Sequence, residues 1–168
     1  LHAANRVFSI IFTDHNMNVD VVFPHLKYES IVENVGYEIN QNIQKSTIYL
    51  IMDMVSRGSQ FIEQLFRFDL VSLISDIFSE SELSIKKLFI KLITNLLFCG
   101  DTEQLMQLIT SKYFEHSITE IQIFTEIKPT VMFLDSVYSA IQKLEPTGHY
   151  YDVKQIILSA TVADSLTE

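Results

Sequence analysis

The residues that could carry out catalysis or bind a metal are few in this chain and lie far apart. The histidines are His2, His15, His25, His116 and His149. They lack the ligand spacing of a zinc site, and no pair of cysteines accompanies them. The sole cysteine, Cys99, follows an apolar run, where we expect a buried structural thiol rather than a nucleophile with a base beside it. The sequence has no glycine-rich phosphate loop and no G-x-S-x-G turn. We therefore predict a protein that is not an enzyme and that binds no metal or cofactor.

A different chemistry, the hydrogen bonding of a peptide backbone, is indicated by two polar side chains in apolar surroundings. Asp53 and Asn95 each stand five residues before a glycine, in stretches that are otherwise mostly apolar. An amide both donates to and accepts from a peptide backbone, and a carboxylate attracts a basic segment. Two interpretations stay open for this pair: a solvated or capping residue on a helix, or part of a groove that binds an extended partner.

The surroundings of these two residues repeat along the chain. Residues 43–45 (Ile-Gln-Lys) open a stretch that ends at residues 56–58 (Ser-Arg-Gly). Forty-two residues later, residues 85–87 (Ile-Lys-Lys) open a second stretch that ends at residues 98–100 (Phe-Cys-Gly). Helical self-similarity at a period of about 40–47 residues is typical of armadillo and HEAT units, which stack into superhelices with a concave binding face.

The elements that must position these residues are helices. Four glycines and three prolines in 168 residues are too few for an architecture of strands and tight turns. We predict an all-α, right-handed armadillo-repeat solenoid, an α-α superhelix that forms a single domain over residues 1–168. Its expected parts are a partial unit at 1–36 and units at about 37–80, 81–125 and 126–168. Long helices are expected to end near Phe12 and to span about 42–56, 83–98 and 129–144.

The long helices are apolar nearly all round, so they must be covered on most sides. In an armadillo unit the third helix has this environment, because it packs on its own two partners and on both neighbouring units. The polar residues that interrupt the apolar pattern should then mark the one open stripe, which faces the concave groove. These residues are Lys45, Asp53, Lys91, Thr94 and Asn95.

Charge and composition limit the partners. The net charge of -9 argues against binding to nucleic acid, which depends on a basic face, and it suits a partner that is itself basic. No apolar stretch approaches 18 residues, so we predict no membrane span. One cysteine without a partner fits a reducing compartment.

The long helices resemble those of importin-α, the armadillo adaptor of nuclear import. The resemblance rests on residues 43–54, 94–104 and 134–141, and the spacing of the tail at 145–157 is similar as well. It covers essentially the whole chain and corresponds to about the C-terminal third of the family's repeat array. It implies a groove in which paired Trp rings hold Lys and Arg side chains while Asn side chains clamp the backbone of the bound peptide.

This chain departs from that pattern at several groove positions. It contains no Trp, and the two Trp-equivalent positions hold Tyr49 and Lys91. A tyrosine ring still attracts a cation, whereas Lys91 would repel one. The residues implied for the peptide-binding groove are Ser46, Tyr49, Asp53, Lys91, Thr94, Asn95 and Ser139.

The resemblance implies a non-enzymatic adaptor that works in the cytoplasm and the nucleus. It would bind a basic nuclear-localisation peptide or protein cargo, or a nuclear transport receptor. Asn95 would clamp the peptide backbone, and Asp53 together with the overall negative charge would attract the cargo. The alternative is a diverged armadillo scaffold for protein–protein interaction that does not bind nuclear-localisation signals.

Overall fold

The chain is helical throughout the part that the structure describes. The computed structural model describes residues 2–14, 18–36, 39–148, 151 and 153–158. These residues form helices joined by short connections, and no strand occurs among them. The predicted all-α class is therefore confirmed. Within the same ranges, no helix is both long enough and apolar enough to cross a membrane.

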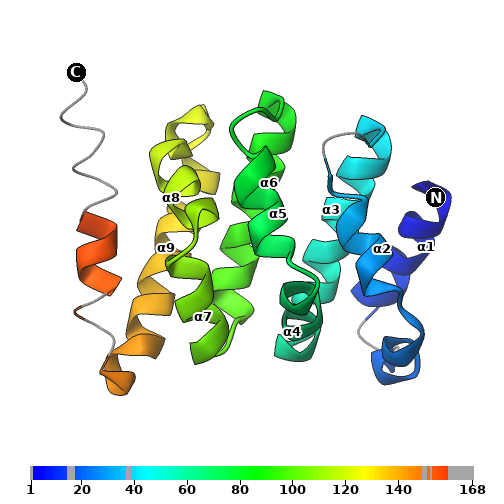
Figure 1. Cartoon of the computed structure of the whole chain (residues 1–168), viewed down its shortest axis with the longest axis horizontal. Coiled ribbons are helices and arrows are strands. Elements are labelled where there is room, and N and C mark those ends of the chain that lie inside the picture. Colours follow the sequence, from blue (N-terminus) through cyan, green and yellow to red (C-terminus); the bar gives the residue numbers. More distant parts are fainter. Residues whose placement is uncertain (1, 15–17, 37–38, 149–150, 152, 159–168) are drawn as a thin grey trace.

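Four long helices form one layer of the array. They are α1 (His2–Thr13), α3 (Gln41–Val55), α6 (Leu83–Cys99) and α9 (Ile127–Leu144). Each packs against the next, α1 on α3, α3 on α6 and α6 on α9. The long helices therefore follow one another in chain order from the N-terminal to the C-terminal end of the molecule (Figure 1).

Shorter helices complete the array. They are α2 (Tyr28–Glu33), α4 (Ser59–Arg67), α5 (Leu70–Ile77), α7 (Thr102–Ile109) and α8 (Lys112–Thr119). Helix α5 packs on α8, and α4 contacts both α2 and α5. Single 3-10 turns lie at Val19–Val21, Phe23–His25, Ile121–Ile123 and Glu145–Thr147. Each long helix thus alternates along the chain with one or two short ones.

Capping residues explain where several helices begin. Asn40 caps α3 by accepting a hydrogen bond from the backbone N–H of Asn42 at 3.0 Å. Asp101 and Gln104 form a capping box at the start of α7, with bonds of 3.0 and 3.1 Å. Gln104 also donates from Nε2 to the Ser59 carbonyl at 3.0 Å, which ties α7 to the start of α4. Gly58 precedes α4 with a φ of +139°, a conformation that favours glycine.

Aromatic side chains fill the junction of α5, α6 and α8. Phe89 of α6 is fully buried, and its ring centroid lies 6.0 Å from that of Phe78 and 6.3 Å from that of Tyr113. The Tyr113 hydroxyl donates to the carbonyl of Phe89. The backbone N–H of Tyr113 donates to Ser75 Oγ at 3.0 Å. This junction joins one long helix to two short ones.

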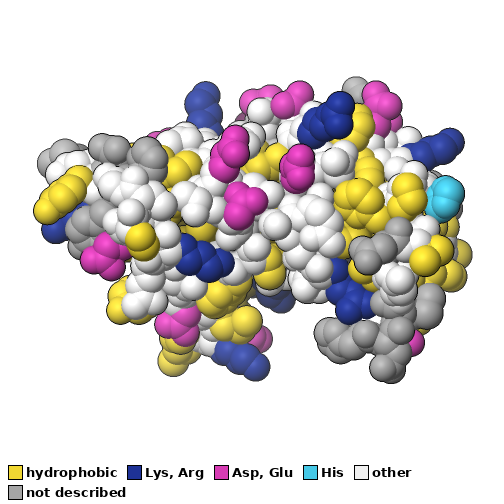
Figure 2. All heavy atoms as spheres, turned by 90° about the horizontal axis from the view of Figure 1, so that it is seen from below, with side chains coloured by type: hydrophobic (Ala, Val, Ile, Leu, Met, Phe, Trp, Pro, Cys, Tyr) yellow, Lys and Arg dark blue, Asp and Glu magenta, His cyan; other side chains and the backbone are white. Residues whose placement is uncertain are grey.

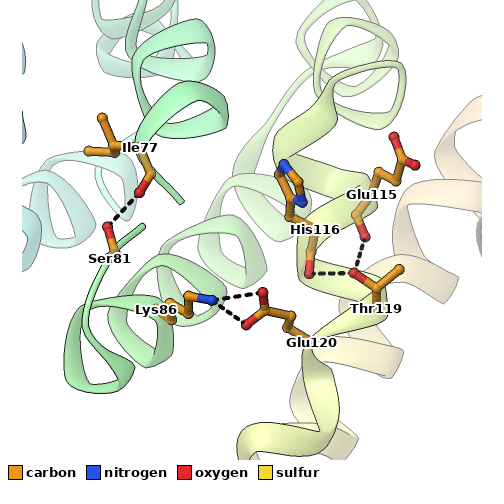
Figure 3. Close-up of polar contacts among 7 residues, drawn as sticks. All are labelled: Ile77, Ser81, Lys86, Glu115, His116, Thr119 and Glu120. Carbon is orange, nitrogen blue, oxygen red and sulfur yellow. Dashed lines mark hydrogen bonds and ion pairs between the residues drawn. The ribbon is translucent and has the colours of Figure 1, made fainter. Parts of the chain in front are cut away.

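An ion pair lies at the edge of the same junction. Lys86 Nζ lies 2.8 and 2.9 Å from the two carboxylate oxygens of Glu120, and Figure 3 shows the two side chains pointing toward each other. Lys86 Nζ also lies 5.7 Å from the centroid of the Phe78 ring, on which His116 stacks at 5.4 Å. These charged side chains therefore join α6 to the end of α8, and His116 has a packing role here.

The long-helix bounds agree with the sequence-based expectation to within two residues. The stretch expected at 42–56 is Gln41–Val55, and the one expected at 83–98 is Leu83–Cys99. The last long helix, expected at 129–144, is Ile127–Leu144 and so begins two residues before Pro129. Pro129 still lies in the first turn, where its missing N–H leaves no helical hydrogen bond unmade. The division of the chain into units stays a prediction.

Candidate functional site

Consecutive long helices share two pockets. The α1–α3 pocket, of about 400 Å³, is lined by Asn5, Arg6, Ser9, Asn42, Lys45, Ser46 and Tyr49. The α6–α9 pocket, of about 350 Å³, is lined by Met52, Ile90, Lys91, Thr94, Asn95, Phe124, Glu126, Lys128, Pro129 and Met132. Five of the seven groove residues expected from the sequence are among these side chains.

The back wall of the α1–α3 pocket is a hydrogen-bonded contact between its two helices. Asn5 is buried, and its Nδ2 donates to Ser46 Oγ at 3.2 Å and to Thr47 Oγ1 at 2.8 Å. Ser46 is itself nearly buried and donates to the Ile43 carbonyl at 2.9 Å. Its hydroxyl is therefore engaged within the protein. We infer that Ser46 shapes the wall and contributes little direct binding.

The rim of the α1–α3 pocket carries an aromatic ring and two cations. Tyr49 is 51% exposed, so its ring is open to a ligand. Arg6 is exposed, and Lys45 is half-buried with a contact of 3.4 Å from Nζ to Gln41 Oε1. Neither cation forms an ion pair with a described acidic residue. Aspartate and glutamate are absent from the described lining of this pocket.

Asp53 lies on the same helix but lines neither pocket. The Ser9 hydroxyl of α1 donates to its Oδ2, so the carboxylate links α3 to α1. Burial raises the pKa of Asp53 above its ordinary value, and the bond from Ser9 acts in the opposite direction. The role of Asp53 in attracting a peptide stays a prediction. Its hydrogen bond with Ser9 holds α1 and α3 together.

Replacing Asp53 by asparagine should stabilise the fold near neutral pH. A raised folded-state pKa means that the charged carboxylate costs stability above that pKa, and that this cost disappears as the pH falls toward the ordinary value of 3.8. Asparagine keeps an oxygen that can accept from Ser9. We expect Asp53→Asn to unfold at higher urea than wild type near pH 7, with the difference shrinking on acidification. The exposed Asp135→Asn change is the control, and an advantage that is constant with pH would contradict the assignment.

The α6–α9 pocket combines apolar side chains with an open amide. Met52, Phe124 and Met132 supply the apolar lining. Asn95 is half-buried, and its side chain makes no hydrogen bond to a described residue, so its donors and acceptor face the pocket unpaired. Thr94 differs from it, because it is buried and its Oγ1 donates to the Ile90 carbonyl at 2.8 Å. Lys91 is exposed at the rim, one helical turn before Asn95.

Sequence reasoning missed part of both pockets and included two residues, Asp53 and Ser139, that line neither. Ser139 is half-buried on α9 and lines neither pocket. The missed residues include Asn5, Arg6 and Ser9 of α1, and Phe124, Glu126 and Lys128 around the start of α9. Glu126 and Lys128 directly precede Pro129, so a search around that expected helix start could have found them.

Acidic side chains gather elsewhere on the molecule. Glu63 and Asp69, at α4 and just after it, surround a hollow of about 700 Å³ together with Asp101 and Glu103 at the start of α7. Figure 2 shows several acidic side chains close together on the face seen from below, which is the side where α4 and α7 lie in Figure 1. The long-helix pockets therefore do not carry the negative charge that dominates the chain.

The candidate metal-ligating residues that the structure describes are not brought together. No three His, Cys, Asp or Glu side chains in the described part of the chain are placed to hold a metal ion. His15 and His149 lie outside the described residues. Burial raises the pKa of the Cys99 thiol, although the nearby Lys143 acts in the opposite direction. Because the thiolate is the nucleophilic form, this environment makes Cys99 less reactive.

Comparisons with known proteins show the fold. Neither a protein-family model nor a curated protein matches this sequence. Among solved structures, a designed armadillo repeat protein matches with a TM-score of 0.70 at 19% identity, over 88% of this chain and 64% of that one. An engineered protein matches with a TM-score of 0.75 at 11% identity, over 95% of this chain. This chain spans less than two thirds of the length of both proteins, 64% and 61% respectively.

A third solved structure is a designed armadillo repeat protein in complex with the peptide (KR)4. It matches with a TM-score of 0.59 at 15% identity, over 97% of this chain and 92% of that one. None of the three is described as an importin-α, so the resemblance to that family stays a prediction. Together the matches confirm that the helices of this chain form an all-α, armadillo-like solenoid.

Proposed function

We propose that this protein is a non-enzymatic binding scaffold that holds an extended segment of another protein along its long-helix layer. The observation that carries the proposal is the unpaired Asn95 amide beside the apolar lining of the α6–α9 pocket. Tyr49 offers an exposed ring in the α1–α3 pocket. The armadillo-like fold supports the proposal, since such solenoids use extended surfaces of this kind for binding.

The two pockets suit different parts of such a segment. The Asn95 amide can donate to a carbonyl of the bound backbone and accept from its N–H, which holds the chain without regard to its side chains. Met52 and Met132 are flexible and polarizable, so the α6–α9 pocket can adapt to an apolar side chain. Tyr49 lines the α1–α3 pocket, where its ring can pack against another side chain of the same bound segment.

The nuclear-import adaptor is the narrower form of this proposal. It requires a basic peptide or a transport receptor as partner, and activity in the cytoplasm and the nucleus. The charges of the two pockets favour the diverged scaffold instead. Among the described lining residues, Arg6, Lys45, Lys91 and Lys128 are cations, and Glu126 is the single carboxylate. Asp53 accepts a hydrogen bond from Ser9, and its attraction of a basic cargo stays a prediction.

Selection from a phage library of random peptides tests the proposal. Wild-type protein should enrich a family of related peptides, and the Tyr49→Ala/Asn95→Ala double variant should lose them. The matched control is Glu63→Ala/Glu103→Ala, which alters the acidic hollow between α4 and α7 and should retain the same peptides. An absence of enrichment, or enrichment that both double variants retain, would refute binding at the long-helix layer. If the enriched peptides are instead rich in Lys and Arg, the result would favour the nuclear-import adaptor over the diverged scaffold.

A further inference from the structure

We infer that the α1–α3 pocket binds an anionic side chain, a carboxylate or a phosphate, so that the scaffold selects an acidic segment rather than a basic one. This inference rests on the proposed function and specifies its partner. The juxtaposition that carries it is Arg6 of α1 and Lys45 of α3, which line one pocket without a carboxylate among its described lining.

The two cations are available to a ligand. Arg6 is exposed and forms no ion pair with a described residue. Lys45 has only a neutral partner, the Gln41 amide, at 3.4 Å. A guanidinium binds a carboxylate or phosphate through two parallel hydrogen bonds, and an ammonium adds a third charged donor. The arrangement therefore provides charge and directed donors from two different helices.

Neutral donors of the same pocket complement these charges. Asn42 is exposed at the start of α3 and lines the pocket, so its amide can donate to an anion beside Lys45. Tyr49 adds a half-exposed ring with a hydroxyl donor. At the back wall, Asn5 Nδ2 donates to Ser46 Oγ, which links the facing positions of α1 and α3.

The neighbouring pocket has the same sign of charge. Lys91 and Lys128 line the α6–α9 pocket, and Glu126 is its only acidic residue among those described. Both pockets are thus cationic on a chain whose net charge is -9. Non-specific attraction to such a chain would favour basic peptides, so a preference for acidic ones must come from a local site. An acidic segment that runs along the layer would meet cations in both pockets.

Fluorescence anisotropy with synthetic peptides of defined charge tests this inference. The probes are an alternating Asp–Glu octapeptide, a Gly–phosphoserine octapeptide, a neutral Gly–Ser octapeptide and the basic peptide (KR)4. We expect at least one of the two anionic probes to bind about tenfold or more tightly than the neutral and basic ones, a difference of about 1.4 kcal/mol. Whichever anionic probe binds better identifies carboxylate or phosphate as the preferred group.

Two matched double variants locate the effect. Arg6→Gln/Lys45→Gln removes both cations of the α1–α3 pocket and should weaken anionic binding about tenfold or more. Lys112→Gln/Lys154→Gln removes the same charge at exposed positions that line neither pocket, and should change binding less than about threefold. Circular dichroism checks that both variants stay folded. Equal losses in the two variants would overturn the inference.

The remaining outcomes separate this inference from the proposed function. If (KR)4 or the Gly–Ser peptide binds better, and Tyr49→Ala/Asn95→Ala abolishes that binding, the scaffold function stands and the anionic preference is wrong. If no probe binds and the phage selection also fails, both are wrong. If no probe binds although selection yields acidic peptides lost in Arg6→Gln/Lys45→Gln, the inference holds and the octapeptides are too short.

Discussion

Replacing Phe89 by alanine is expected to lower the free energy of unfolding by about 3–5 kcal/mol. Phe89 is fully buried in α6, between Phe78 and Tyr113. Truncation leaves a cavity at the junction of α5, α6 and α8, and the aromatic neighbours on both sides lose their contacts. Because total stabilities of about 5–15 kcal/mol are usual for a domain, this loss is a large fraction of the total. Urea unfolding followed by circular dichroism measures the change.

Phe98→Ala is the matched control for this substitution. Phe98 lies on the same helix and has the same side chain, but it is 40% exposed. We expect it to cost roughly 1 kcal/mol, because part of its apolar surface is in water in the folded state as well. Similar losses for Phe89→Ala and Phe98→Ala would show that the junction of α5, α6 and α8 does not carry the stability of the array.

The fold could be predicted from the sequence because its strongest signal is local. The apolar pattern of α3 and α6 is repeated at an interval of 42 residues, and each stretch ends just before a glycine. A helix that is apolar nearly all round must be surrounded, and stacking of like units is the arrangement that surrounds it. The repeated apolar pattern and the glycines near the helix ends therefore predicted the type of element, the layer of long helices and the bounds of those helices.

The candidate site was less predictable because it depends on contacts between units. Thr94 and Asn95 are adjacent in the sequence and both polar. Thr94 is nevertheless buried and donates to the carbonyl of Ile90 in its own helix, while Asn95 faces the pocket. Asp53 was expected to face a ligand, and the structure adds a contact that the sequence did not indicate, because Ser9, forty-four residues away, donates to it. The pairing of Ser9 with Asp53 follows from the register of α1 on α3, which no spacing within one helix specifies.

The charge of the pockets was hidden for the same reason. A net charge of -9 indicates a basic partner when it is averaged over the surface. In the folded chain four acidic residues gather between α4 and α7, whereas Arg6 and Lys45, thirty-nine residues apart, share a pocket. Net charge sets the average field, and the local arrangement of side chains sets the preference of a site.

Changing Lys91 to tryptophan is expected to shift the preference of the long-helix layer toward basic peptides. Lys91 is exposed at the α6–α9 pocket, one turn from Asn95. Two like charges 4 Å apart repel by roughly 4 kcal/mol at an effective dielectric constant of 20, and by less where water enters an open pocket. The substitution removes that repulsion and adds a ring face that attracts cations. We expect the affinity for (KR)4 to rise about tenfold, or about 1.4 kcal/mol.

The same substitution should weaken binding of the Asp–Glu octapeptide, because Lys91 is one of the cations that an acidic segment would meet. Stability should change by less than about 0.5 kcal/mol, since the side chain is exposed. Lys112→Trp is the matched control, at an exposed lysine of α8 that lines neither pocket. If Lys112→Trp raises the affinity for (KR)4 as much as Lys91→Trp does, the gain comes from net charge alone. If Lys91→Trp changes neither affinity in a well-folded protein, bound segments do not run past the α6–α9 pocket.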